Sequence, residues 1–91
     1  MRLARSHIVY HGKLDRAVLV VRCHESLMKE SVLSQEMQDT LEQLLIEQQD
    51  LPEVFSLAIL QQYSRQKRAV RKSRHLCEQL LYAYCAKGYL L

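Results

Sequence analysis

Turn-forming residues are scarce in this chain, which has two glycines, Gly12 and Gly88, and a single proline, Pro52, among 91 residues. An all-β fold needs frequent turns, so this scarcity argues against a sandwich or a barrel. Long apolar runs are missing as well, because the longest, residues 54–60, covers only seven residues and includes Ser56. Spanning a bilayer takes roughly 18 to 20 apolar residues. We therefore expect helices joined by few loops and no association with a membrane.

Sequence signals for export and for disulfide bonding are also absent. No apolar stretch near the N-terminus is long enough for a secretory signal. The three cysteines, Cys23, Cys77 and Cys85, are an odd number without the spacing of a disulfide framework. We therefore expect a cytoplasmic protein with reduced thiols, in which Cys77 is buried and Cys85 is more accessible.

The chain lacks the common motifs of catalysis and of metal binding. Cys23 with His24, and His75 with Cys77, do not have the C-x-x-C or H-x-x-x-H spacing that lets one element offer two ligands. Glycine-rich phosphate loops and G-x-S-x-G strings do not occur. A small chain with few loops also leaves little room for a substrate cleft. We predict no metal, no cofactor, no small-molecule substrate and no enzymatic activity.

An amphipathic helix is predicted from Ser34 to about Asp50. Ser34 is a favourable N-cap, and Glu36 lies in the first turn. At about 100° per residue, most of the leucines of this segment lie on one side of the helix and its acids on the other. Ile46 is the exception, because it lies on the acidic side.

Pro52 suits the first position of the following helix, since the missing N–H of proline costs nothing there. Residues 53–87 contain no glycine or proline, so one long helix is allowed. Apolar residues occur all round the helix between 54 and 60, however, and on one side only after Ser64. This change favours two helices with a break near residues 63–65.

The remaining segments predict helix at both ends of the chain. Residues 14–29 have apolar residues at helical spacing, but the run Val18–Val21 also suits a strand, so a β-hairpin over residues 6–22 is the alternative. We favour the helix, because a lone hairpin is only marginally stable. The last helix is expected to end near Lys87, with Gly88 as its C-terminal cap.

Together these segments predict one all-α domain, residues 1–91, built as a small bundle of three or four helices; the alternative is an α+β fold with the N-terminal hairpin. A chain of this size buries only about 60 to 65% of the surface that its unfolded form exposes. Its stability alone should be modest. Binding to another protein or to a second copy is therefore expected.

Charges of opposite sign are sorted into different segments. Residues 30–53 carry seven acids and no base, whereas residues 54–91 carry seven bases against one acid, Glu78. Six of these bases lie between Ser64 and His75, namely Arg65, Lys67, Arg68, Arg71, Lys72 and Arg74. A helix with this charge would attract phosphates or acidic proteins. The acidic helix of the same chain or of a second copy is a further candidate to neutralise it.

A nucleic-acid-binding regulator using the basic helix 64–75 is one interpretation of this cluster. Tyr63 is the only aromatic residue beside it, and the sequence pI of about 8.9 lies below the usual footprint of nucleic-acid-binding domains, above 9. We therefore treat nucleic acid as the alternative partner.

Surplus apolar residues favour a protein partner instead. Three amphipathic faces would already fill a small core, so further apolar residues must be buried elsewhere within the fold or against a partner. We favour a partner or a second copy. The candidates for this contact surface are Ile46, Phe55, Leu57, Leu60, Tyr89, Leu90 and Leu91. The main hypothesis is a non-enzymatic protein-binding module of the chaperone, adaptor or inhibitor type, with an apolar helix surface steered by the basic helix.

Overall fold

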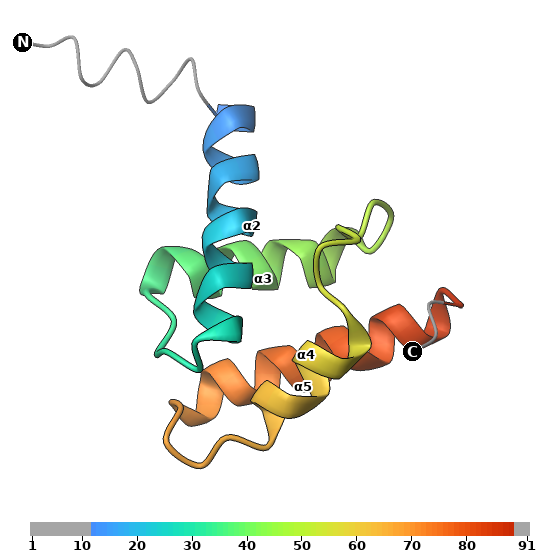
Figure 1. Ribbon diagram of the computed structural model, residues 1–91. Coiled ribbons are helices and arrows are strands. Elements are labelled where there is room, and N and C mark those ends of the chain that lie inside the picture. The colour runs from blue at the N-terminus through green and yellow to red at the C-terminus, as the bar shows by residue number, and fades with distance from the viewer. Residues whose placement is uncertain (1–11, 89–91) are drawn as a thin grey trace, which may run out of the picture.

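The computed structural model describes residues 12–88, and the side chains from Arg16 onward. Four helices make up this part of the chain: α2 (Gly12–Met28), α3 (Gln35–Glu47), α4 (Leu57–Ser64) and α5 (Arg71–Ala86). No strand occurs among these residues, which confirms the all-α class (Figure 1). No helix in residues 12–88 is long and apolar enough to cross a membrane.

The helices pack around one core. α4 and α5 form a helical hairpin, α3 packs on α5, and α2 packs on both α3 and α4 (Figure 1). The largest fully buried side chains are Tyr63, Tyr84, Phe55, Leu33, Leu41, Leu44, Leu60 and Leu80. Because these residues come from α3, α4, α5 and the loops, no single helix carries the core.

The alternative N-terminal hairpin is wrong over the residues that the structure describes. Residues 12–22 of the predicted hairpin 6–22 are helical, and residues 6–11 lie outside the described part of the chain. The helix places Val20, Cys23 and Leu27 on one buried face at spacings of three and four residues. A strand would send alternate residues to opposite faces, so it could not bury all three together.

α3 begins where its sequence predicts. The Met37 N–H donates to the Ser34 hydroxyl at 3.2 Å, so Ser34 is the N-cap. The helix ends at Glu47, about three residues earlier than expected, because Gln48 adopts a left-handed conformation with φ of 53°. The Gln48 N–H donates to the Leu44 carbonyl at 2.9 Å and closes the last turn.

The next helix does not begin at Pro52. Its N-cap is Ser56, whose hydroxyl accepts from the Ile59 N–H at 3.2 Å. Leu51 and Phe55 are both buried, and the Tyr84 hydroxyl donates to the Pro52 carbonyl. The segment before α4 is therefore held by its side chains in the core, and Ser56 supplies the cap that Pro52 lacks.

The predicted break between the last two helices is confirmed. α4 ends at Ser64 and α5 begins at Arg71. Folding back lets the buried face of α4 share the core with α5, whereas one continuous helix would leave that face without a partner. The Tyr63 hydroxyl donates to the Ser31 carbonyl at 2.5 Å and ties the end of α4 to the α2–α3 loop.

The end of α5 also agrees with its sequence. Lys87 is the C-cap residue, and Gly88 has a φ of 89°, which favours glycine. The predicted apolar tail, Tyr89 to Leu91, lies outside the described residues.

Candidate functional site

The structure places most of the described apolar residues predicted for partner binding inside the core. Phe55 is 1% exposed, Leu57 8% and Leu60 0%. These three side chains are not available to a partner, because the packing of α4 against α5 covers them. Ile46 is 75% exposed and remains a candidate contact residue.

A different apolar surface is exposed along α2. Val18 and Val21 are each about half exposed, and Val54 from the α3–α4 loop is 37% exposed. One hollow of about 540 Å³ is lined by Arg16, Ala17, Val20, Val21, Glu47, Asp50, Pro52, Glu53 and Val54, and a neighbouring one of about 380 Å³ by Ala17, Val18, Val21, Arg22 and Glu25. Ala17 and Val21 belong to both, so we treat them as one surface, the α2 groove.

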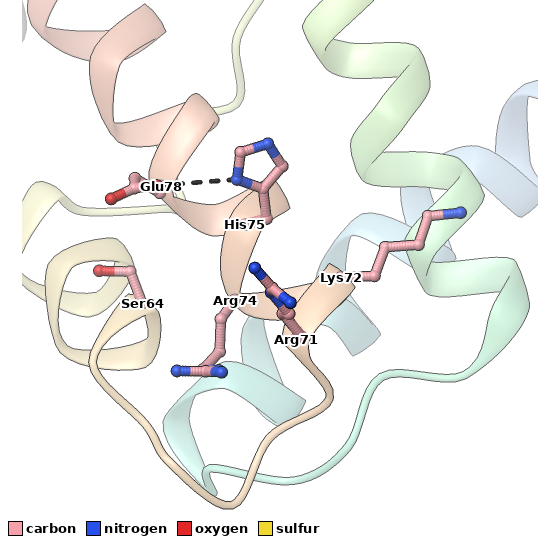
Figure 2. Close-up of a pocket in the computed structure, with 6 residues that line it drawn as sticks. All are labelled: Ser64, Arg71, Lys72, Arg74, His75 and Glu78. Carbon is pink, nitrogen blue, oxygen red and sulfur yellow. Dashed lines mark ion pairs between the residues drawn. The ribbon is translucent and has the colours of Figure 1, made fainter.

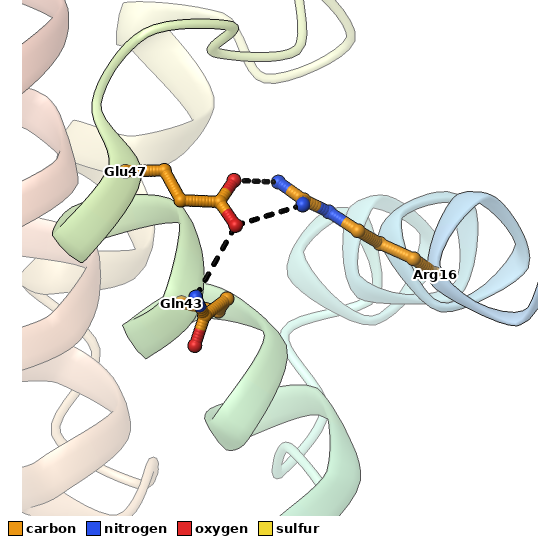
Figure 3. Close-up of polar contacts among 3 residues, drawn as sticks. All are labelled: Arg16, Gln43 and Glu47. Carbon is orange, nitrogen blue, oxygen red and sulfur yellow. Dashed lines mark hydrogen bonds and ion pairs between the residues drawn. The ribbon is translucent and has the colours of Figure 1, made fainter. Parts of the chain in front are cut away.

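An ion pair fixes one edge of the α2 groove. The Arg16 guanidinium donates to both carboxylate oxygens of Glu47, with N–O distances of 2.6 and 3.0 Å, and the Gln43 amide donates to the same carboxylate at 3.2 Å (Figure 3). Hydrogen bonds from Arg16 and then from Gln43 lower the pKa of Glu47. The bidentate geometry joins α2 to α3 at this edge of the groove.

The predicted basic helix 64–75 is only half helical. Arg65, Lys67 and Arg68 lie in the α4–α5 loop, whereas Arg71, Lys72 and Arg74 lie in the first turn of α5. Ala69 is buried, and the hairpin needs a connection at this point. The six bases are therefore divided between a loop and the start of a helix, and they do not form a stripe along one helix.

Within residues 16–88 the acidic helix does little to neutralise these bases. Lys72 lies 3.9 Å from Glu42, and both side chains are about half exposed, so the pair is weak. The other five bases of the cluster form no ion pair with a described residue. Most of the positive charge is therefore available to a ligand.

A hollow of about 760 Å³ lies beside the start of α5. Its lining residues are Ser64, Arg71, Lys72, Arg74, His75 and Glu78, and we call it the basic hollow (Figure 2). In this view Arg74 reaches toward the end of α4, whereas Lys72 extends toward α3. The His75 ring nitrogen lies 3.7 Å from the Glu78 carboxylate. This is a concave and mainly cationic surface.

The remaining reactive side chains do not form a metal-binding group within the described residues. No three His, Cys, Asp or Glu side chains in this part of the chain gather within reach of one metal ion. Cys23 and Cys77 are buried, and burial raises the pKa of the first to about 11 and of the second to about 12. Thiols in this state are poor nucleophiles. Cys85 is exposed, as its position on the helix predicts.

Comparison with known protein families identifies a family to which this chain is similar. The family model described as "Family of unknown function (DUF5717) C-terminal" matches residues 9–91, which is most of the chain. The chain belongs to this family. No curated protein and no solved structure matches this chain.

For this member of the family, the α2 groove is the surface that sequence reasoning missed. The run Val18–Val21 carried the signal, since apolar residues at four successive helix positions cannot all face one side. Val20 faces the core and Val18 and Val21 face out. The sequence left this run undecided between helix and strand, and in a strand all four residues could be buried, two on each face. The exposed side of the helix was therefore not recognised.

Proposed function

We propose that this chain is a non-enzymatic protein-binding module whose α2 groove holds an amphipathic helix of another protein. The partner helix has apolar residues on the face that enters the groove and basic residues beside that face. An amphipathic helix bound in an apolar groove is a recurring mode of protein recognition.

The exposed apolar floor of the groove is the observation that carries the proposal. Val18, Val21 and Val54 keep between a third and a half of their surface in water, although the same helices bury many other apolar side chains. Apolar area gains about 25 cal/mol per Å² when it leaves water. A contiguous patch framed by charged residues is typical of a binding site.

Charges at the rim favour a basic partner. Glu47 is held by Arg16, whereas Asp50 and Glu53 form no ion pair with a described residue. Glu25 lies at the rim of the neighbouring hollow with Arg22. These unpaired carboxylates would attract a basic segment and repel an acidic one, which sets orientation more than affinity.

The basic residues take a different part in this proposal from the one that the sequence suggested. The α4–α5 loop lies at the opposite end of the fold from the first turns of α2 (Figure 1). These bases would repel a basic partner at that end, so they favour its approach from the α2 side, and the acids at the rim make the local contacts.

Two synthetic peptides test the groove directly. Both are amphipathic helices with the same alanine and leucine face, one flanked by lysines and the other by glutamates. Calorimetric titration should show binding of the lysine peptide and much weaker binding of the glutamate peptide. Val21→Glu should weaken binding at least tenfold, because it places a charge on the groove floor.

Val32→Glu is the matched control. Val32 is 59% exposed but lies in the α2–α3 loop outside the groove. Equal binding of the two peptides, or an unchanged affinity of Val21→Glu, would contradict the proposal. Light scattering on the same samples tests for self-association. If the unmodified protein is a dimer and Val21→Glu dissociates it, the groove is occupied by a second copy of this chain.

A further inference from the structure

The basic hollow is a second surface that the groove does not explain. It is lined by three full cations, Arg71, Lys72 and Arg74, against the single acid Glu78, and Glu78 already faces His75. The loop that leads into it adds Arg65, Lys67 and Arg68. We propose that the basic hollow and this loop bind the phosphate backbone of nucleic acid without reading its base sequence.

Unused hydrogen-bond donors support an anionic ligand. The Nε atom of Arg74 is buried, and no described residue accepts its hydrogen bond. Buried donors are normally satisfied, and a guanidinium donates most favourably to a carboxylate or phosphate oxygen. Arg74 lines the hollow, and a phosphate bound there would be an acceptor for its guanidinium.

The helix start adds positive potential at the same place. Val70, the N-cap residue of α5, supplies no side-chain acceptor, and no acid lies in the first turn. The first intrahelical bond runs from the Arg74 N–H to the Val70 carbonyl at 3.1 Å, so the N–H groups before Arg74 have no partner within the helix. Bases at this end oppose the helix dipole and disfavour the helix. A bound anion would accept from the free N–H groups and would offset the repulsion between the bases and the helix dipole.

The shape and composition of the surface favour a polyanion over a compact ligand. The bases continue from the hollow over the α4–α5 loop, so the positive surface is longer than one phosphate group needs. Four of the six bases are arginines, whose planar guanidinium matches phosphate geometry. A nucleic acid backbone presents phosphates in such a row, whereas an acidic peptide has no comparable fixed spacing.

Base reading is not expected at this surface. Tyr63, the aromatic residue next to the cluster, is 0% exposed, and its hydroxyl donates to the Ser31 carbonyl. It cannot stack on a base while it is held there. Binding should then depend on phosphate contacts alone, and affinity should be insensitive to sequence.

Fluorescence anisotropy with two labelled DNA duplexes of unrelated sequence tests the inference. Both duplexes should bind with affinities within about threefold of each other. If about four phosphates are contacted, affinity should fall roughly 150-fold between 50 and 200 mM salt. The double variant Arg71→Glu and Arg74→Glu should lose at least tenfold in affinity at the lower salt concentration.

A matched control separates local contacts from net charge. Lys29 and Lys87 are exposed and line neither the basic hollow nor the α2 groove, so the double variant Lys29→Glu and Lys87→Glu changes the charge equally and should stay within about threefold of the unmodified protein. Circular dichroism confirms that both variants fold. Polyglutamate at equal charge should compete poorly with the duplexes.

Three results would overturn the inference: no saturable binding at low salt, equal affinity of the two double variants, or competition by polyglutamate as strong as that by DNA. The last would assign the surface to an acidic protein instead. None of these results affects the proposal for the α2 groove, because the peptide titrations test variants of different residues.

Discussion

Phe55 separates the core described by the structure from the contact surface suggested by the sequence. Its side chain is 1% exposed and lies just before α4, among the buried residues of the core. Phe55→Ala removes the ring and leaves a cavity that the helices on either side cannot fully close. Changes of this kind cost about 3 to 5 kcal/mol of unfolding free energy.

This loss is large for a chain of this size. Small domains are stable by about 5 to 15 kcal/mol, and for 60 to 100 residues each kcal/mol shifts Tm by roughly 4 to 8 °C. We expect Phe55→Ala to lower Tm by at least about 12 °C and to shift the urea midpoint, followed by circular dichroism at the helix minimum. The neighbouring Val54→Ala, which changes a 37% exposed side chain, should stay within about 0.5 kcal/mol.

The opposite pattern would refute this reasoning. If Phe55→Ala left the urea midpoint unchanged and instead weakened binding of the lysine peptide, Phe55 would be a contact residue, as the sequence suggested. If Phe55→Ala lowers the free energy of unfolding but leaves its slope against urea concentration unchanged, Phe55 belongs to the core.

Two further predictions concern titrating groups. The pKa of Glu47 is lowered in the folded state by Arg16, so its contribution to stability is present above the unfolded value of about 4.5 and is lost as pH falls through the folded pKa. Glu47→Gln should therefore narrow the stability difference between pH 7 and pH 3, and an unchanged acid unfolding profile would contradict the ion pair. Among the thiols, Cys85 should react rapidly with a thiol reagent in the native protein. The two buried thiols, Cys23 and Cys77, should react only on unfolding, and mass spectrometry of native and urea-treated samples distinguishes these cases.

Local features of the fold could be read from the sequence with good precision. Ser34 caps α3, α4 ends at Ser64 within the predicted break, and Gly88 follows the last helix, each as expected. These features depend on residues within a few positions of one another, such as a hydroxyl three residues before an N–H. Pro52 is the exception, because Ser56 supplies the cap and the core holds the preceding loop.

The candidate sites were harder to predict, since exposure depends on what covers each face. The sequence indicated that some apolar residues must remain outside one small core, but it did not identify them. Phe55 and Leu60 have the same apolar character as Val18 and Val21, and only packing places the first pair inside and the second outside.

The sequence by itself determined the helical class, the positions of most helix ends and the segregation of charge, because these follow from turn residues, caps and the order of side chains along the chain. The tertiary structure alone decided which surfaces remain open. By folding α4 back on α5 it buried Phe55, Leu57 and Leu60, divided the six bases between a loop and a helix start, and left the outer face of α2 uncovered. Burial is a property of contacts between distant segments, and helical periodicity does not encode which segments meet.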